Sequence, residues 1–349
     1  MMKRCPKLLI VVVVLLSMAG CEDFNTSEAF SDYKILFISR RIDNSADWKM
    51  YLMNKDGSDQ HAVTDTTVQC EAPAVSNDYR KIAFVHLSKT NEMELYVVNV
   101  DGTGLHLIDK SDQFVGSPVF TSDNTSLIYT RYISATNYGI YKSDLVSPGI
   151  ALDYLNNCGN IVFSQDLKTI TFLQDNTIYK INTDGSDKKV FIENAGSFTY
   201  STLGNKIAYL AKGTIGSPQI FVANVDGTNQ KQITESYLRN WDSGFAPFGN
   251  YDPQWTPDES MIVYTSDAND GLPEIYITDA SGMIHQRLTN TDRRNESPVI
   301  TPDGRYILFS SNRDLSYSAD IYRMNLDGSD QIPLTKYVGD DCFPVIVRQ

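Results

Sequence analysis

Few residues in this sequence have the types and spacing that metal binding or acid–base catalysis requires. Three of the four histidines, His61, His106 and His285, come soon after Asp-Gly or Ser-Gly turns, in segments that we expect to be outer strands. Only His86 is expected on the face where a ligand could bind. Because a zinc or manganese centre needs several converging ligands, the histidines predict no such centre and no cofactor.

Carboxylates suggest a weaker alternative, a hard cation held where several strands begin. Glu71, Asp252, Glu296 and Asp341 each open a strand that we expect to line the inside of the fold. Calcium prefers about six to eight oxygen ligands, and the sequence has no D-x-D-x-D-G loop to supply them. These residues are therefore weak metal candidates, and the alternative is that they are surface carboxylates facing water.

Loop cations form a second set of ligand-binding candidates. Arg40, Arg41 and Arg313 lie in or beside expected loops, and Arg131 and His86 fall at the ends of expected strands. A guanidinium can bind a carboxylate or sulfate through two parallel hydrogen bonds. The alternative is that these are ordinary solvated loop charges.

Aromatic side chains are concentrated in the longest insertion, Glu235–Tyr251. This segment contains Tyr237, Trp241, Phe245 and Phe248. Aromatic residues on a long loop are typical of a recognition surface. The alternative is that they pack on one another as a plug over a channel.

An internal repeat positions these candidates. Its clearest copy, SPVITPDGRYILFSSNRDLSYSADIYRMNLDGSDQIPLT, spans residues 297–335. The copies align at a proline or an equivalent residue, and these positions are Pro73, Pro118, Ile161, Phe198, Pro253, Pro298 and Pro344. Their spacing is 37 to 55 residues. A period of about 40–45 residues is typical of propeller blades.

Each copy predicts four antiparallel strands. A short strand, a Pro-Asp turn and an alternating strand such as KIAFVH are followed by a polar loop, an IYxxN strand, an Asp-Gly turn and a last strand. Glycine adopts the positive φ that such hairpin turns need. The Pro-Asp and Asp-Gly turns should lie on one face, here called the turn face. The other loops and the connections between blades should share the opposite loop face.

The two ends of the repeat array are complementary. The first unit, which begins at Tyr33, lacks its leading strand, and the chain ends with a spare strand, DCFPVIVRQ. Pairing the two would remove open sheet edges. We therefore predict an all-β fold, a seven-bladed β-propeller of four-stranded antiparallel blades closed by the C-terminal strand. Six blades is the alternative, if the degenerate unit from Cys158 to Ala195 is wrongly divided.

The N-terminus resembles an export signal. Lys3, Arg4 and Lys7 precede an apolar run that is too short to span a bilayer, so residues 1–20 are interpreted as a signal peptide. LSMAGC resembles the lipobox of bacterial lipoproteins, which implies that Cys21 carries lipid, that residues 21–32 are a tether, and that residues 33–349 form the propeller. The resemblance implies an outer membrane lipoprotein facing the periplasm or the cell surface. An ordinary signal peptide with an incidental cysteine is the alternative.

The Pro-Asp, IYxxNxDG and LT elements resemble the repeats of TolB-type propellers, which are related to WD-repeat blades. The resemblance covers nearly all of residues 33–349. It implies a monomeric, non-catalytic envelope lipoprotein, held at the membrane by its lipid anchor, that binds a protein, peptide or glycan through its loop face. Similar propellers precede the hydrolase domain of prolyl oligopeptidase-like peptidases, but this chain has no G-x-S-x-G motif.

An enzyme is the alternative function. Propeller-fold polysaccharide lyases are a second resemblance; they use a His or Tyr to remove a proton beside a uronate whose charge an Arg or metal neutralises. His86, Arg131 and Tyr138 would take those roles here. Nucleic acid is not an expected partner, because the formal net charge of −13 leaves no basic footprint for a phosphate backbone.

Overall fold

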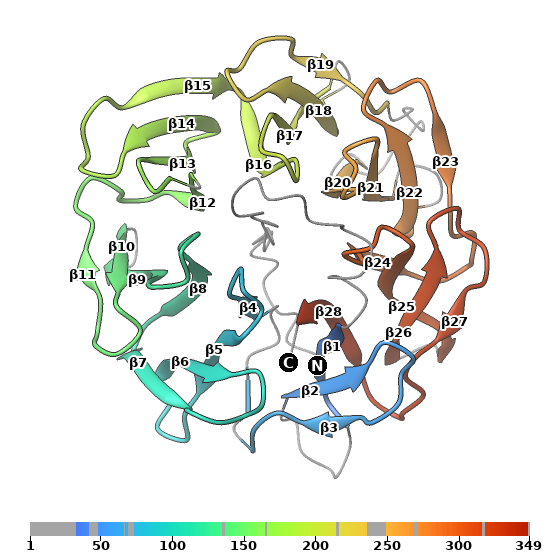
Figure 1. Cartoon of the computed structure of the whole chain (residues 1–349), viewed down its shortest axis with the longest axis horizontal. Coiled ribbons are helices and arrows are strands. Elements are labelled where there is room, and N and C mark those ends of the chain that lie inside the picture. Colours follow the sequence, from blue (N-terminus) through green and yellow to red (C-terminus); the bar gives the residue numbers. More distant parts are fainter. Residues whose placement is uncertain are drawn as a thin grey trace, which may run out of the picture.

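The protein is a closed ring of seven four-stranded antiparallel sheets (Figure 1). The computed structural model describes residues 33–41, 48–65, 67–68, 73–134, 137–164, 166–213, 216–235, 249–267, 271–315 and 318–347. The architecture confirms the predicted all-β, seven-bladed propeller, and the six-bladed alternative is wrong. Within these ranges, no helix has the length and apolarity that crossing a bilayer would need.

The blades follow one another in sequence order around the ring. From the innermost to the outermost strand, the first four are blade 1, with β28 (Asp341–Val347), β1 (Lys34–Ser39), β2 (Lys49–Asn54) and β3 (His61–Ala62); blade 2, with β4 (Ala74–Val75), β5 (Lys81–Leu87), β6 (Met93–Asn99) and β7 (His106–Ser111); blade 3, with β8 (Val115–Phe120), β9 (Leu127–Ser134), β10 (Asn137–Ser143) and β11 (Ile150–Ala151); and blade 4, with β12 (Gly159–Phe163), β13 (Thr169–Gln174), β14 (Thr177–Asn182) and β15 (Lys189–Glu193). The remaining three are blade 5, with β16 (Ala195–Tyr200), β17 (Lys206–Lys212), β18 (Pro218–Asn224) and β19 (Lys231–Gln232); blade 6, with β20 (Asn250–Trp255), β21 (Met261–Ser266), β22 (Glu274–Asp279) and β23 (His285–Arg287); and blade 7, with β24 (Asn295–Ile300), β25 (Tyr306–Leu315), β26 (Ser318–Asn325) and β27 (Ile332–Pro333).

The C-terminal strand closes the ring as predicted. β28 pairs antiparallel with β1, and the register sets Lys34 opposite Val347 and Ser39 opposite Asp341. The apolar side chains of β28 join one buried cluster with residues of blades 7, 1 and 2. The strands β1 and β28 therefore share one sheet and one core.

Asp-Gly turns hold the two outer strands of most blades together on the turn face. In the turn after β2, Asp56 Oδ1 accepts hydrogen bonds from the backbone N and the hydroxyl of Ser58, at 2.9 and 2.6 Å. Gly57 has φ +85°, and a Cβ there would lie 2.7 Å from the carbonyl oxygen of Leu334 in the preceding blade. The glycine thus serves both the turn and the contact between blades.

A bulge marks the innermost strand of six blades. The pairing register shifts beside the aligned proline or its equivalent in β8, β12, β16, β20, β24 and β28. Residues just before the proline, such as Ser117, Asp252 and Ser297, have φ between 52° and 58°. Proline has no N–H to give to a ladder, so a bulge is a position that tolerates it. The aligned prolines therefore mark a recurring bend in the inner wall.

A close aromatic pair, stacked in six blades and tilted in blade 7, recurs between the second and third strands. Ring centroids are 5.5 to 5.8 Å apart in these seven pairs: Phe37–Tyr51, Phe84–Tyr96, Tyr129–Tyr141, Phe172–Tyr179, Tyr209–Phe221, Tyr264–Tyr276 and Phe309–Tyr322. Cross-strand aromatic pairs stabilise a sheet by about 0.2–1 kcal/mol each. These pairs explain the high tyrosine and phenylalanine content of the repeat.

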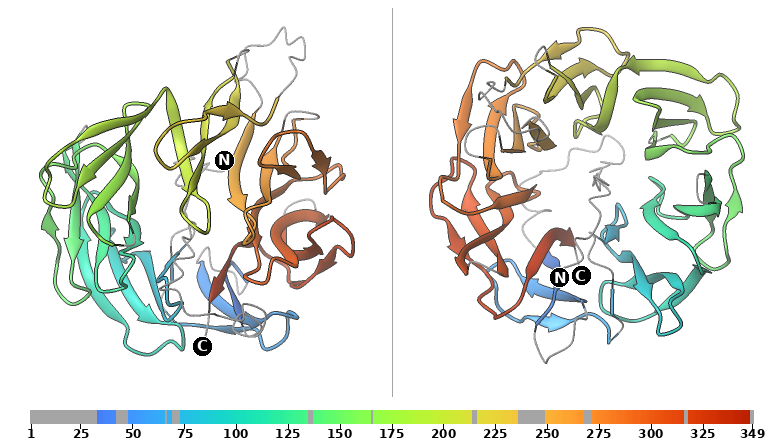
Figure 2. Two further views of the ribbon diagram at one scale, coloured as in Figure 1. Left: turned by 45° about the horizontal axis from the view of Figure 1, so that its top comes forward. Right: turned by 180° about the vertical axis from the view of Figure 1, so that it is seen from behind.

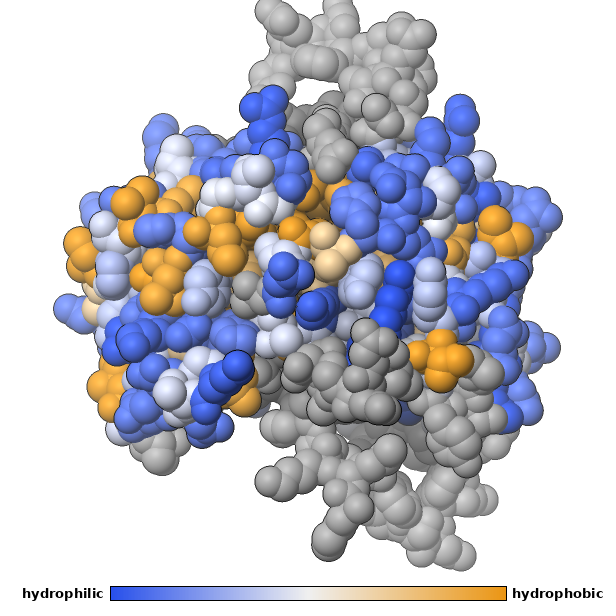
Figure 3. Space-filling model, turned by 90° about the horizontal axis from the view of Figure 1, so that it is seen from below, coloured by the Kyte–Doolittle hydropathy of each residue, from blue (hydrophilic) through white to orange (hydrophobic). Residues whose placement is uncertain are grey.

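The outer rim is polar with a local apolar area. Figure 2 shows the ring from two further sides, with the outermost strands forming its edge. In Figure 3 apolar residues gather toward one side of the rim, the side on which Figure 1 places β7. Exposed apolar side chains there are Leu105, Leu107, Val146 and Ile150.

Candidate functional site

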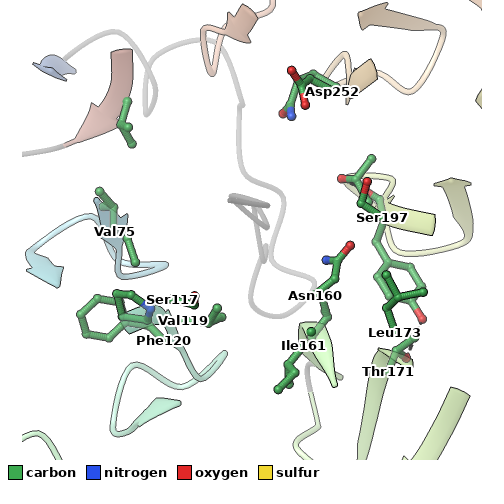
Figure 4. Close-up of a pocket in the computed structure, with 18 of the residues that line it drawn as sticks. Val75, Ser117, Val119, Phe120, Asn160, Ile161, Thr171, Leu173, Ser197 and Asp252 are labelled. Atoms are coloured by element: carbon green, nitrogen blue, oxygen red, sulfur yellow. Dashed lines mark hydrogen bonds between the residues drawn. The ribbon is translucent and has the colours of Figure 1, made fainter. Parts of the chain in front are cut away.

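A central cavity of about 1270 Å³ passes along the ring axis. It is lined by residues of the innermost strand of all seven blades, from β4 to β28. Figure 4 shows Ser117, Asn160, Ser197 and Asp252 around this space, together with apolar residues such as Val75. The residues at the bulges of blades 3 to 7 are therefore polar and line the cavity, whereas its other lining residues are both polar and apolar.

Of the four carboxylates that the sequence suggested as cation ligands, the three that the structure describes do not form a common cluster. Asp252 and Glu296 line the cavity, and Glu296 pairs with Arg294 at 2.8 Å. Asp341 is fully buried in the junction between blades 7 and 1, and Glu71 lies outside the described residues. Across the described ranges, no three His, Cys, Asp or Glu side chains are grouped so as to hold a metal ion.

The histidines lie where the sequence placed them. His61, His106 and His285 are in the outermost strands β3, β7 and β23. His86 is in β5, where its Nδ1 lies 2.8 Å from the carbonyl oxygen and 2.9 Å from the hydroxyl of Thr67. Cys158 and Cys342 are free thiols.

The loop arginines are already engaged within the chain. Arg313 donates to Gln331 Oε1 at 2.6 Å and to Asn295 Oδ1 at 2.7 Å, and its guanidinium lies 4.6 Å from the ring centre of Tyr322. Arg40 pairs with Asp340 at 2.9 Å. Both side chains thus hold the fold together, and their role in ligand binding stays a prediction.

His86, Arg131 and Tyr138 do not converge. His86 contacts Thr67 of the segment that leaves blade 1. Arg131 Nη1 donates to both carboxylate oxygens of Asp109 in blade 2, at 3.0 Å each. Tyr138 packs on the opposite side, in the cluster shared with blade 4. The three side chains therefore have their contacts in three different grooves between blades.

Two sequence-based candidates lie outside the described residues. Trp241, Phe245 and Phe248 belong to the long insertion, and Cys21 belongs to the N-terminal segment. The recognition loop and the lipidated cysteine therefore stay predictions.

The structure adds an aromatic cluster that the sequence did not single out. Tyr132 on β9 lies between Phe114, whose ring is tilted by 39° with the centroids 4.9 Å apart, and Tyr138 on β10, which stacks with it at 6.1 Å. All three residues line the cavity, and the neighbouring Ile133 is 53% exposed. A Cβ at Gly116 would lie 2.9 Å from the Phe114 ring, so this glycine makes room for that ring. We call Phe114, Tyr132, Ile133, Tyr138 and Asp175 the aromatic corner.

Asp175 gives the aromatic corner a negative charge. It lies in the two-residue turn between β13 and β14, where Asp175 and Asn176 have φ of 48° and 57°. Burial raises the pKa of Tyr138, and the nearby Cys158, Tyr132 and Asp175 add to this effect. Asp175 itself is exposed. A regular signal for this site was present in the sequence, since Tyr132 and Tyr138 flank a short hairpin connection and are cross-strand partners.

A second polar region, the closure corner, lies between blades 7 and 1. It comprises Arg41, Asp320, Thr335, Tyr337 and Asp341. Thr335 donates to Asp320 Oδ1 at 3.1 Å, and Arg41 lies 3.5 Å from Asp341 Oδ2. Burial raises the pKa of Asp320 to about 6, against the lowering effect of Thr335, and the Asp341 carboxylate adds to the rise. Burial also raises the pKa of Asp341, against the lowering effects of Ser39, Arg41 and Thr335.

These observations define the class of the protein: a closed seven-bladed β-propeller with a central cavity. The family model for the TolB β-propeller domain matches residues 195–345. The Tol-Pal system protein TolB of Francisella tularensis is 28% identical over 201 residues, which cover 53% of this chain and 43% of that protein. The chain is therefore similar to TolB β-propellers, most clearly over residues 195–345.

Solved structures agree on the fold. The crystal structure of TolB from Acinetobacter baumannii is 18% identical, with a TM-score of 0.58, and the match covers 92% of this chain and 67% of that one. An oligogalacturonate lyase in complex with manganese is 12% identical, with a TM-score of 0.55 and coverage of 86% and 85%. At such identities the likeness concerns the fold alone. The matched region spans about two-fifths of the length of the curated relatives.

Proposed function

We propose that this protein is a non-catalytic binding propeller of the cell envelope, whose loop face holds a protein, peptide or glycan partner. The exposed aromatic corner carries this proposal. Every blade already has its own close aromatic pair, so the fold does not need a further stack in blade 3. Exposed aromatic and aliphatic side chains at a cavity mouth supply the contact energy that a partner's surface requires.

The positions of the candidate side chains support a binding role more than the polysaccharide lyase alternative. The lyase alternative needs a base and a charge-neutralising group on one side of a substrate. His86, Arg131 and Tyr138 face three different grooves, and Arg131 is neutralised by Asp109. The likeness to a TolB of the Tol-Pal system supports an envelope partner for this chain as well.

A pair of photo-cross-linking residues tests the binding face. One replaces Ile133 in the aromatic corner, and the other replaces Val225, which is 37% exposed in the Asp-Gly turn region of blade 5 on the turn face. In intact cells, we expect cross-linked products from position 133 and none from position 225. Equal products from both positions, or products from position 225 alone, would contradict the proposal.

Attachment to the membrane is part of the proposed function. The lipobox-like LSMAGC segment supports lipid on Cys21. Cys21→Ala should release the protein from the membrane fraction into the soluble envelope fraction. Unchanged partitioning of this variant into detergent would rule out the lipid anchor, while the loop-face binding proposal would stand on the cross-linking result.

A further inference from the structure

Three of the seven repeated aromatic pairs, those of blades 1, 4 and 7, hold a cation from another of the chain's described side chains. The guanidinium of Arg41 lies 4.4 Å from the ring centre of Tyr51 in blade 1, and that of Arg313 lies 4.6 Å from Tyr322 in blade 7. In blade 4 the Lys188 ammonium lies 4.2 Å from Tyr179. Stacked rings attract a cation through the negative charge of their faces.

Tyr132 and Tyr138 form an aromatic pair of the same kind, placed nearer to the loop face. Their centroids are 6.1 Å apart and their planes differ by 28°. Within the described part of the chain, no lysine or arginine lies over either ring. Tyr132 is 37% exposed, so its ring is open to a cation from outside.

The charges around the aromatic corner favour such a cation. Arg131 and Lys188 are the neighbouring cations, and they are held by Asp109 and by Gln174 Oε1, the latter at 2.7 Å. Asp175 and Asp112 are exposed carboxylates that form no ion pair with the described residues. Asp112 lies two residues before Phe114. The corner therefore combines a partly exposed tyrosine, over whose ring no described cation lies, with carboxylates that form no ion pair among the described residues.

Aliphatic side chains near the rings would contact further residues of a bound peptide. Ile133 is 53% exposed next to Tyr132, while Leu173 and Ile161 line the adjoining cavity wall. A peptide can offer a cationic side chain together with apolar neighbours. An extended peptide segment could continue into the cavity of about 1270 Å³. A neutral glycan carries no positive charge to match the carboxylates or to lie over the rings.

We propose that the aromatic corner binds a lysine or arginine side chain of an extended peptide segment, with the cation between Tyr132 and Asp175. This inference rests on the proposed function and names the chemistry of the partner. The rings would contribute cation–π attraction, and Asp175 would contribute the opposite charge.

Titration with short peptides tests the chemistry directly. The full chain is titrated with fluorescein-labelled tetra-arginine, and with tetra-glutamine and tetra-glutamate as neutral and acidic controls. We expect saturable binding of tetra-arginine only. Tyr132→Ala, which changes no charge, should weaken that binding at least five-fold, and Tyr132→Phe should retain it because the ring face is kept.

Charge variants separate a site from general attraction to an acidic protein. Asp175→Asn keeps a turn residue that tolerates positive φ, so the fold should be unchanged. It should weaken tetra-arginine binding at least three-fold and reduce its dependence on salt. Asp65→Asn removes one exposed carboxylate of blade 1 and is the matched control, expected to have no such effect.

Two outcomes would overturn the inference. Equal effects of Asp175→Asn and Asp65→Asn, with no effect of Tyr132→Ala, would show nonspecific attraction. Absence of tetra-arginine binding while position 133 still cross-links would show that the partner class is wrong and that loop-face binding stands. Absence of both tetra-arginine binding and cross-linking from position 133 would contradict the proposed function as well.

Discussion

Two corners of the loop face use the same kinds of side chain for different ends. At the closure corner Arg41 lies 3.9 Å from the ring centre of Tyr337 and 4.4 Å from that of Tyr51, and its guanidinium also approaches Asp341. At the aromatic corner Tyr132, Tyr138 and Asp175 have no such internal cation among the described residues. Aromatic and charged groups that satisfy one another stabilise the fold, whereas those left open are available to a partner.

The polar junctions between blades sharpen this contrast. Asn295 Nδ2 donates to Glu274 at 2.8 Å between blades 6 and 7, and Asn250 Nδ2 donates to Gln219 at 2.9 Å between blades 5 and 6. At the closure corner, Asp341 occupies the position that these asparagines have in the other junctions, and its carboxyl group lies near that of Asp320. Burial raises the pKa of both carboxyl groups, so we expect a proton shared between them to take the place of the amide hydrogen of the other junctions. The closure is therefore the pH-dependent junction among these three.

Removing the closing strand should have the largest effect. Deletion of residues 343–349 removes Val345, Ile346 and Val347, whose buried side chains contribute about 1.5–3 kcal/mol each, and exposes a long sheet edge. We expect thermal unfolding, followed by circular dichroism, to lose its cooperativity or to shift down by more than about 10 °C. A chain lacking only residues 348–349 is the control, and a wild-type melting curve for the longer deletion would contradict closure by β28.

Arg313→Ala should have the next largest effect. The substitution leaves buried Asn295 without its donor and removes the guanidinium from the rings of Phe309 and Tyr322. We expect the free energy of unfolding to fall by about 2–3 kcal/mol, measured by urea denaturation. Arg305→Ala, at an exposed position on the turn face, should change it by less than about 0.5 kcal/mol. Equal effects of the two variants would show that Arg313 is a free loop cation.

Asp341→Asn should alter the dependence of stability on pH. The pKa of Asp320 is about 6 in the folded state, above its value of 3.8 in an unfolded chain, so its contribution to stability is present below pH 4 and is lost as pH rises through 6. Asn at position 341 supplies the missing amide donor and removes one of the two charges. We expect the variant to gain about 1 kcal/mol at pH 8 and little at pH 4, from melting curves across this range.

The neighbouring junction provides the reverse experiment. Asn295→Asp places a second carboxyl group beside Glu274, as Asp341 stands beside Asp320. This variant should lose stability at pH 8 and recover most of it at pH 4. Parallel pH profiles of wild type and both variants would refute the shared-proton account of the closure.

Ile133→Ser should have the smallest effect on stability. Its side chain is 53% exposed, so the free energy of unfolding should change by no more than about 0.5 kcal/mol. Its contact with a partner's apolar surface would be lost, and tetra-arginine binding should weaken two- to three-fold in the same titration. A large loss of stability would mean that this residue supports the aromatic corner rather than the ligand.

The sequence predicted the fold because each blade repeats its signals. Asp-Gly turns and the aligned prolines recur in most blades, and the strand missing from the first unit matches the spare strand at the end of the chain. The candidate sites were harder to predict from the sequence, because they depend on the face of the strand to which each side chain points. Asp341 lies one residue farther from its proline than Glu296 does, which places it in a blade junction and not in the cavity.

The arginines and the extra tyrosines illustrate the same limit. Arg313 was identified as a loop cation, but its partners Asn295 and Gln331 are 18 residues away on either side, and only pairing of the strands brings them together. Tyr132 was one of many tyrosines in the sequence. Its exposure and its contact with Phe114 follow from the register of β8, β9 and β10.

Hydroxyl-radical footprinting tests the division between the two corners most directly. Tyr132 and Tyr337 are 37% and 49% exposed, so both rings should be oxidised at measurable rates in the free protein. With saturating tetra-arginine, the account predicts protection of Tyr132 and an unchanged rate for Tyr337, read by peptide mass spectrometry. Protection of Tyr337, with Tyr132 oxidised as in the free protein, would contradict it.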